Sequence, residues 1–459
     1  PHWPGGGPMG DVSRRAFLSR SGAVAGGLAL GGVAACESGD ERADRRAGPA
    51  GGAGESAAAF DPTDWGSVRD QFPLTRDIRH FAAFVLAAHP RPVADAIERH
   101  RRGLDEDTHG YLEEHQGENE IAARRAAAEY LGAAAEEIAF TDSTTMGLGL
   151  VYGGLRLRPG QEVVTTEHDF YSTHEALRLA ADRSGATVRR VRLYDRPSQT
   201  SVDEIVGRLT ATVTPATRAV AVTWVHSSTG VKLPIAQIGA ALAELNAGRD
   251  GAEPVLLCVD GVHGLGVEDE TMTTLGCDFL MSGTHKWLFG PRGTGIVWGR
   301  REAWDAIDPT IPPFAGEHFS AWAGGLTPGG ADPGASNTPG GYHSFEHRWA
   351  VAEALRFHLD IGKAAIAERT HEQATQLKAG LAELSGIEVV TPADPGLSAG
   401  IVCVSVGEIA AAGVVGSLLH RNIAASITPY REAYLRFGPS IVTSPDQVDA
   451  VVEAMRELF

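Results

Sequence analysis

The chain has 459 residues, of which 43% are hydrophobic and 21% are charged, and this composition is typical of a globular protein long enough to form two domains. Its formal net charge is −18, which argues against nucleic acid or an anionic membrane surface as a partner. The four cysteines form no CxxC motif and no Cys/His cluster, so no metal site is expected. Two of them, Cys258 and Cys403, lie within apolar runs and are interpreted as buried thiols rather than as parts of a disulfide framework.

Residues 1–59 have the features of an export signal followed by a linker. The pair Arg14-Arg15 precedes a Gly/Ala-rich apolar run at 23–35, an arrangement that resembles a Tat signal and predicts a periplasmic or otherwise extracytoplasmic protein. That run is too short and too rich in glycine for a stable membrane-spanning helix. Cys36 ends a stretch similar to a lipobox, so it is interpreted as a lipid anchor, with a simple cleavage site as the alternative. Residues 37–59 lack large apolar side chains, which indicates a flexible tether.

Beyond residue 60, helical and strand patterns alternate. In chain order they predict a helix at 121–131 that ends at Gly132, a strand at 162–166, a helix at 174–183, and strands at 187–193, 218–224, 255–259, 279–282 and 295–298. Short β-rich runs separated by helices indicate an α/β fold with a mostly parallel central sheet flanked by helices.

The pattern changes near residues 337–341, which are rich in glycine and proline. A helical pattern at 346–361 is followed by strand patterns at 387–390 and 401–406, which predicts a smaller α+β C-terminal domain. The predicted division is a signal with its linker, an N-terminal segment, a large domain and a small domain, at 1–59, 60–119, 120–340 and 341–459.

A carboxylate and an imidazole follow the apolar strand at 255–259, in the order Asp260-Gly261-Val262-His263. A side chain at the carboxyl end of a parallel strand points into the crevice where α/β folds bind ligands. An aspartate in this position is often only the N-cap of a helix, so Asp260 by itself does not identify a site.

Lys286 follows the next predicted strand, in the segment Ser282-Gly283-Thr284-His285-Lys286-Trp287. A lone lysine is usually a solvated surface residue, but this one lies among small and polar residues between two strands. Partial burial and nearby positive charge would lower the pKa of its amine, which favours imine formation. With Asp260, it meets the needs of pyridoxal 5′-phosphate (PLP), which requires a lysine for a Schiff base and an acid that keeps the pyridine nitrogen protonated.

Together these blocks resemble the class V aminotransferase family, in which an Asp is followed three residues later by Gln or His and then by a Ser/Thr-His-Lys segment. The resemblance covers roughly residues 65–459 and implies PLP fold type I. It implies that Lys286 holds PLP as a Schiff base, that Asp260 pairs with the pyridinium nitrogen and that His263 lies close to the ring hydroxyl.

The same resemblance assigns the phosphate of PLP to the segment around Thr144 and Thr145, which falls between a strand and a helical run. Backbone amides and hydroxyls at a helix N-terminus suit a phosphate, although an ordinary capping threonine is the alternative. Thr284 and His285 would complete this cradle. Many relatives have a serine three residues before the lysine, where this chain has Gly283, so the individual assignments stay open.

Three further positions carry over from the family. His168, in a Glu-His pair, is expected to stack on the PLP ring, and Ser227 lies where desulfurases have an asparagine beside the ring hydroxyl. Arg436 is expected to bind the α-carboxylate of the substrate, for which a guanidinium is well suited. The substrate is therefore expected to be an amino acid or a related amine.

The resemblance implies an aminotransferase-like enzyme, with a C–S lyase or an epimerase as alternatives and a non-catalytic ligand-binding lipoprotein as a more remote one. Persulfide transfer, as in cysteine desulfurases, is not expected, because no cysteine lies between Val404 and Arg436. The family also implies a homodimer, with the Gly/Pro-rich run 324–341 as the candidate loop that reaches the neighbouring phosphate and Thr338 as a candidate contact.

Overall fold

The computed structural model describes residues 60–249, 253–407 and 411–459. The predicted signal, its linker and Cys36 therefore lie outside the described residues. Three of the four cysteines, Cys258, Cys277 and Cys403, are buried free thiols, which confirms the interpretation of Cys258 and Cys403.

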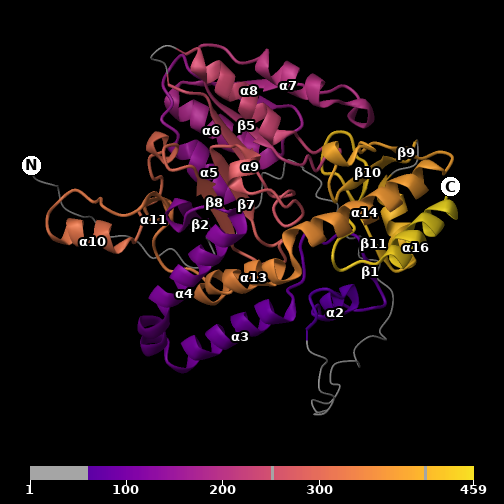
Figure 1. Cartoon of the computed structure of the whole chain (residues 1–459), viewed down its shortest axis with the longest axis horizontal. Helices are drawn as coiled ribbons and strands as arrows, with labels where there is room; N and C mark the ends of the chain where they lie inside the picture. Colours follow the sequence, from indigo (N-terminus) through magenta and orange to yellow (C-terminus); the bar gives the residue numbers. More distant parts are fainter. Residues whose placement is uncertain (1–59, 250–252, 408–410) are drawn as a thin grey trace, which may run out of the picture. The chain divides into compact units, whose positions relative to one another are not determined.

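A seven-stranded sheet forms the centre of the fold, in the order β2-β8-β7-β6-β5-β3-β4 (Figure 1). Its strands are β2 (Ile138–Thr141), β3 (Glu162–Thr166), β4 (Thr187–Val191), β5 (Thr217–Thr223), β6 (Leu256–Asp260), β7 (Phe279–Gly283) and β8 (Gly295–Gly299). Strand β8 runs antiparallel to β7 and β2, and all the other pairings are parallel. The predicted α/β fold with a mostly parallel sheet is confirmed.

Helices cover both faces of this sheet because its strands bury side chains on both faces. One hydrophobic core joins the strands to α5 (Thr144–Gly154) and α6 (Tyr171–Ser184). The other joins them to α7 (Val202–Thr210), α8 (Ile235–Ala247) and a set of helices from both ends of the chain. That set comprises α3 (Arg91–Glu106), α4 (Thr108–Leu131) and α13 (Val351–Ile361).

Two predicted helices differ from the observed ones for local reasons. Helix α4 ends before Gly132, as predicted, and Gly132 adopts the left-handed conformation with a φ of 62°. The helix begins at Thr108 instead of residue 121, because the carboxylate of Asp107 caps it by accepting from the backbone N–H of Gly110. The pattern at 346–361 forms two helices, α12 (Phe345–Trp349) and α13, separated at Ala350, where ψ is −5°.

A smaller four-stranded sheet lies toward the C-terminus, in the order β12-β13-β10-β9. Its strands are β9 (Glu388–Val389), β10 (Val402–Ser405), β12 (Ser426–Ile427) and β13 (Leu435–Phe437), and its helices are α14 (Lys363–Ala382), α15 (Ala411–His420) and α16 (Pro445–Arg456). The N-terminal strand β1 (Arg79–His80) pairs in parallel with β11 (Ile423–Ala424), so the segment that follows residue 60 is joined to this C-terminal region. The domain boundary at residue 340 stays a prediction.

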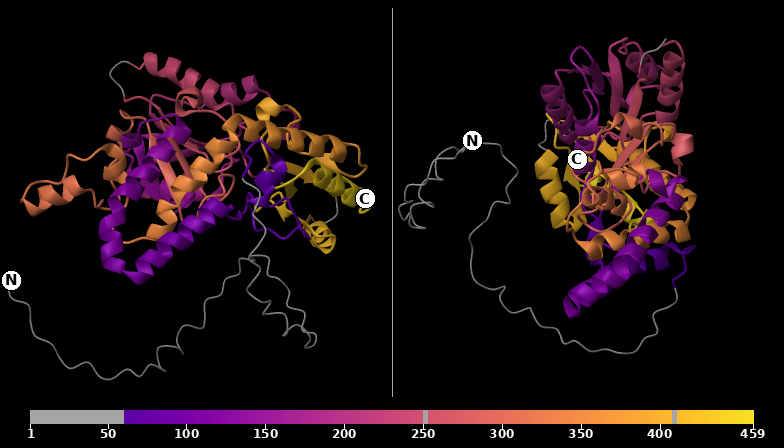
Figure 2. Two further views of the ribbon diagram at one scale, coloured as in Figure 1. Left: turned by 60° about the horizontal axis from the view of Figure 1, so that its bottom comes forward. Right: turned by 90° about the vertical axis from the view of Figure 1, so that its left-hand side faces the viewer.

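The remaining elements are short. They are α2 (Trp65–Asp70), α9 (Met272–Leu275), α10 (Gly316–Ala323), α11 (Pro333–Asn337) and 3₁₀ turns at Ala135–Glu137, Pro197–Gln199, Trp304–Ala306 and Pro395–Leu397. Figures 1 and 2 show α10 projecting away from the central sheet. Within the described ranges, no helix is both long and apolar enough to span a membrane. The same residues gather no group of three or more side chains suited to bind a metal ion.

Candidate active site

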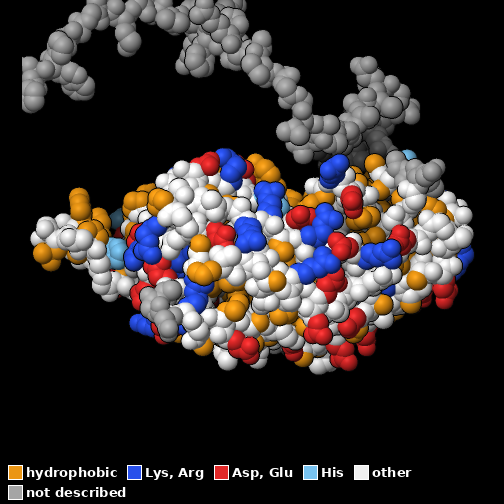
Figure 3. All heavy atoms as spheres, turned by 90° about the horizontal axis from the view of Figure 1, so that it is seen from above, with side chains coloured by type: hydrophobic (Ala, Val, Ile, Leu, Met, Phe, Trp, Pro, Cys, Tyr) orange, Lys and Arg blue, Asp and Glu red, His pale blue; other side chains and the backbone are white. Residues whose placement is uncertain are grey.

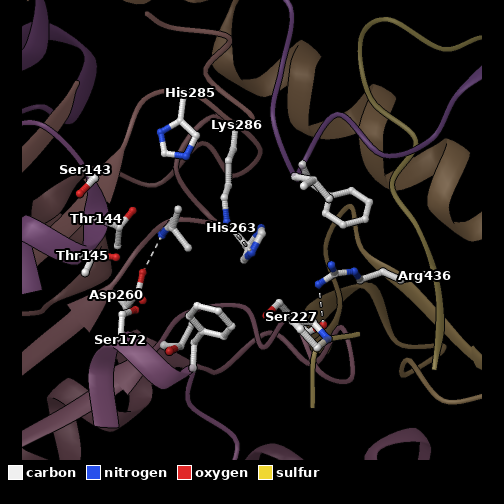
Figure 4. A pocket seen from close by; sticks show the side chains of 16 residues that line it. Ser143, Thr144, Thr145, Ser172, Ser227, Asp260, His263, His285, Lys286 and Arg436 are labelled. Carbon is white, nitrogen blue, oxygen red and sulfur yellow. Dashed lines mark hydrogen bonds between the residues drawn. The ribbon is translucent and has the colours of Figure 1, made fainter. Parts of the chain in front are cut away.

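The carboxyl ends of β2, β5, β6 and β7, which run in the same direction, open toward one cavity of about 340 Å³. It is lined by Phe84, Val85, Ser143, Thr144, Thr145, Phe170, Ser172, Thr223, Ser227, Asp260, Val262, His263, His285, Lys286, Pro429 and Arg436. In Figure 4, Ser143, Thr144 and Thr145 lie on one side of Lys286, and Arg436 lies on the other. This is the crevice in which open α/β sheets bind their ligands.

Lys286 lies in the turn between β7 and β8, with its Nζ 3.3 Å from Nε2 of His263. Backbone hydrogen bonds between Thr284 and Thr294, and between Gly290 and Thr284, hold this turn in place. Burial lowers the pKa of the Lys286 amine to about 8; the positive charge of Arg436 adds to this effect and the carboxylate of Asp260 opposes it. The amine is therefore largely protonated at neutral pH but has a much larger neutral fraction than an ordinary lysine.

Asp260 is the last residue of β6 and is 1% exposed. Its Oδ1 accepts a hydrogen bond from the backbone N–H of Val262 at 3.1 Å. Burial raises the pKa of this carboxyl to about 6, against the effects of the Val262 hydrogen bond and of Lys286. Thr223 is paired with Asp260 across β5 and β6, lines the same cavity, and has a buried hydroxyl with no partner among the described residues.

One end of the cavity is built from the N-terminus of α5. The hydroxyl of Ser143 caps this helix by accepting from the N–H of Met146, and Thr144 Oγ1 accepts from the N–H of Gly283 at 2.7 Å. A Cβ at position 283 would lie 2.7 Å from the His285 ring and 3.1 Å from Thr144 Oγ1. This close packing leaves no room for a Cβ at position 283 unless a neighbouring side chain moves. The free amides of the first helical turn suit an anion.

Arg436 forms the other end of the cavity. Its guanidinium donates to the Ser426 hydroxyl and to the carbonyl oxygens of Ser227 and Ile427, at 3.0, 3.1 and 3.3 Å. It also lies over the ring of Phe84, 4.7 Å from its centroid. These contacts orient the group but include no carboxylate, so in the described part of the chain the Arg436 charge has no partner within salt-bridge distance.

Two of the predicted site residues do not reach this cavity. The hydroxyl of Thr284 forms a hydrogen bond with Thr294 Oγ1, and the residue is fully buried within the turn that holds Lys286. The ring of His168 stacks on Tyr194 with centroids 3.9 Å apart, and Phe170 lines the cavity instead. The structure does bring together the other eight: Thr144, Thr145, Ser227, Asp260, His263, His285, Lys286 and Arg436.

The position of His168 has a local cause. The carboxylate of the next residue, Asp169, accepts hydrogen bonds from the Thr165 hydroxyl and from the N–H groups of Thr166 and Thr223. These bonds fix the turn after β3, and in this turn Phe170 borders the cavity while His168 packs away from it.

Several residues of the site were not anticipated. Phe84 and Val85 come from the segment after β1, and their place at the cavity depends on the pairing of β1 with β11. Tyr430 adjoins the cavity through a 2.8 Å hydrogen bond between its hydroxyl and that of Ser227. The aromatic residues of the segment 428–434 were the one signal that could have indicated this contact.

The side chains of the cavity fit the functional groups of PLP. The α5 terminus suits the phosphate, the Asp260 carboxylate suits a protonated ring nitrogen, and the Lys286 amine suits the aldehyde. The unpartnered Thr223 hydroxyl is a further polar group free to meet a ligand. No cysteine is among the lining residues, and burial raises the pKa of the Cys403 thiol to about 12, so Cys403 is not a nucleophile at neutral pH.

Comparisons with known proteins agree with this fit. The sequence model of the family "Aminotransferase class-V" matches residues 89–427. Isopenicillin N epimerase of Amycolatopsis lactamdurans is 29% identical over 350 residues, which cover 73% of this chain and 83% of that protein. A cysteine desulfurase of Enterobacter sp. (strain 638) is 27% identical over 370 residues, or 74% and 82% of the two chains.

The fold is also similar to solved structures. One is a variant of C-DES with glycine covalently linked to its PLP cofactor. Its superposition on this chain has a TM-score of 0.78 at 22% sequence identity and covers 99% of that chain and 85% of this one. This likeness supports the assignment of the fold.

Proposed function

The chain belongs to the class V aminotransferase family of PLP-dependent enzymes, and from this premise we propose that it acts on an α-amino acid. When bound, PLP withdraws electrons from the bonds at the amino acid Cα and so weakens them. The observation that carries the proposal is a single cavity that joins the amine of Lys286, the carboxylate of Asp260 and the guanidinium of Arg436.

Each of these groups has a task that its surroundings support. Arg436 binds the α-carboxylate, because its own hydrogen bonds go to a hydroxyl and two carbonyl oxygens and leave its charge uncompensated. Asp260 keeps the ring nitrogen of the cofactor protonated from within a buried strand end. Lys286 Nζ takes and returns the proton at Cα, for which a pKa of about 8 is well matched to neutral conditions.

Transamination is the reaction that we place first, since it requires only one proton carrier at Cα. The test is turnover of a panel of amino acids by the purified chain, with and without a 2-oxo acid acceptor. We expect turnover only with the acceptor, and none in the Lys286→Ala variant. Turnover without an acceptor would contradict transamination but not the wider proposal that the chain acts on an α-amino acid. A chain that takes up PLP but shows no spectral response to any amino acid would contradict the wider proposal.

A C–S lyase or an epimerase is the second candidate, and one observation favours it. The hydroxyls of Ser227 and Tyr430 form a pair beside Arg436, and burial keeps Tyr430 protonated by raising its pKa. Such a pair is a proton donor suited to a leaving group or to a substrate carbon, which transamination does not require. Release of the β-substituent, or inversion at Cα, without an acceptor and lost in Tyr430→Phe would identify this chemistry. Persulfide transfer is not proposed, because no cysteine lines the cavity.

We further propose that the protein is a homodimer. Large apolar side chains are exposed on and around α10: Phe314, Phe319, Trp322, Leu326 and Tyr342 are between 62% and 87% exposed. Figure 3 shows hydrophobic side chains on this projecting end of the molecule. A patch of this kind is typical of a surface covered by a partner. The Thr338 hydroxyl is already used within its own chain, where it accepts from the N–H of Phe140 and donates to the carbonyl of Gly334.

Export by the Tat route and lipid attachment at Cys36 are also proposals. Their support is the twin-arginine segment with its short apolar run and lipobox-like end. Replacement of Arg14 and Arg15 by lysine should retain the protein in the cytoplasm. Cys36→Ala should abolish incorporation of a labelled fatty acid while leaving export intact. Export that is unaffected by the double replacement would contradict the Tat assignment.

A further inference from the structure

A chain of two hydrogen bonds leads from Trp287 to the amine of Lys286. The indole N–H of Trp287 donates to Nδ1 of His263 at 3.1 Å, and Nε2 of the same ring lies 3.3 Å from Lys286 Nζ. Figure 4 shows His263 and Lys286 pointing toward one another inside the cavity. Trp287 and His263 are 2% and 4% exposed, so water does not compete freely for these contacts.

The first bond determines the second. An indole N–H can only donate, so Nδ1 of His263 must be the acceptor and cannot carry a proton. Burial keeps the ring neutral by holding the pKa of His263 well below its ordinary value. The single ring proton must then lie on Nε2, where it points at Lys286 Nζ. A neutral amine accepts that proton, whereas an ammonium has no lone pair and would meet it with repulsion.

Four titratable or charged groups face the Lys286 amine. Asp260 favours the ammonium, whereas Arg436 disfavours it. His285 is neutral like His263, because burial lowers its pKa. The one attractive charge is therefore opposed both by Arg436 and by the orientation that Trp287 imposes on His263.

We propose that Trp287 is a positioning residue that fixes His263 as the Nε2–H tautomer and thereby increases the fraction of Lys286 that is a neutral amine able to bond the cofactor. This inference rests on the proposed role of Lys286 as the PLP lysine. Trp287 touches neither the reacting atoms nor the cavity, and it acts only through His263.

The test is the pH dependence of PLP uptake by the full-length chain after its cofactor has been removed. Only a neutral amine adds to an aldehyde, so the midpoint of the uptake rate reports the protonation of Lys286. In Trp287→Phe the Nδ1 position is released, His263 can take the other tautomer, and Nε2 can accept from the ammonium. We expect the midpoint to rise by about one pH unit, which is about a tenfold slower uptake at neutral pH.

Trp298→Phe is the matched control. Trp298 is also buried, and its indole N–H donates to Glu137 Oε2 at 3.0 Å, away from the cavity. This variant should keep the wild-type midpoint. An unshifted midpoint in a folded Trp287→Phe variant overturns the inference, while failure of the wild-type chain to take up PLP overturns the proposed function instead.

A second measurement uses the unmodified chain, so it does not depend on the folding of a variant. The ¹⁵N chemical shifts of the His263 ring, assigned by their loss in His263→Gln, distinguish a protonated nitrogen from an acceptor. We expect a protonated Nε2 and an acceptor Nδ1. A protonated Nδ1 would overturn the inference whatever the uptake kinetics show.

Discussion

Arg436 is positioned by its own chain before any substrate arrives, with hydrogen bonds to Ser426, Ser227 and Ile427 and the Phe84 ring against its plane. Lysine cannot reproduce this planar group or bind a carboxylate through two parallel bonds. We expect Arg436→Lys to raise KM for the amino acid about 100-fold, by loss of ~2–3 kcal/mol of charge-assisted bonding. Steady-state kinetics against a matched amine without the carboxylate provides the control, and an equal loss for both substrates would contradict the assignment.

The buried carboxylate of Asp260, at the end of β6, lowers the stability of the fold when it is charged. Its pKa is raised by burial from 3.8 to about 6, so protonation favours the folded state. In the chain without PLP, the stability linked to this group is complete below pH 4 and declines as the pH rises through about 6. We therefore expect Asp260→Asn to stabilise that chain at pH 7 by ~2–3 kcal/mol while abolishing turnover.

Thermal unfolding of the Asp260→Asn variant and the wild type, at about pH 4 and pH 7, checks this sign. The stabilisation should be present at neutral pH and nearly absent under acidic conditions. A variant that is less stable than the wild type at neutral pH would contradict the conclusion that the buried Asp260 charge destabilises the chain without PLP.

Asp260 and Lys286 could be identified from the sequence because each follows a short apolar strand that is buried on both faces. Phe84 and Phe170 could not be predicted in the same way. Phe84 reaches the cavity through the pairing of residues 79–80 with 423–424, a contact for which the local sequence has no signal. Phe170 borders the cavity because Asp169 fixes the preceding turn, although the Glu-His pair had indicated His168.

The N-terminal end of α5 packs closely against the start of the turn that holds Lys286. Adding one methyl group between them should push the two segments apart. A Cβ at position 283 would lie 2.7 Å from the His285 ring and 3.1 Å from Thr144 Oγ1, at the bond that joins the two elements. We expect Gly283→Ala to weaken PLP binding about tenfold by displacing this end of the cavity. Equilibrium titration with PLP measures the effect. The control is Gly207→Ala on α7, where an added Cβ has no neighbour within 4 Å and should leave binding unchanged.

Strands and helices also differ in how well the sequence predicts their bounds. Strands such as β3, β6 and β7 lie within two residues of their predicted bounds, because parallel strands buried on both faces produce continuous apolar runs. The first half of α4 has no such pattern, since its stability depends on the Asp107 cap and on packing against α3 and α12. Helix periodicity also did not reveal the interruption at Ala350 between α12 and α13.

At the scale of the whole molecule, the site is assembled from both ends of the described chain. The large sheet supplies Asp260 and Lys286, the small sheet supplies Arg436, and the segment after β1 supplies Phe84. The substrate binding proposed for Arg436 and the chemistry proposed for Lys286 would therefore depend on the contacts between the two sheets. Among these contacts is the carbonyl of Ser227, which accepts from Arg436.

The exposed apolar side chains around α10 lead to the last prediction. Phe319 and Trp322 are 62% and 64% exposed on one short helix. We expect an apolar surface of this kind to be covered by a partner chain. We expect light scattering to show about twice the mass of one chain for the wild type, and the mass of a single chain for Phe319→Asp with Trp322→Asp. Leu419→Asp, at a residue 57% exposed on α15, is the control and should remain a dimer. A wild type that stays monomeric at micromolar concentration would contradict the dimer, and a double variant that stays dimeric would move the interface away from α10.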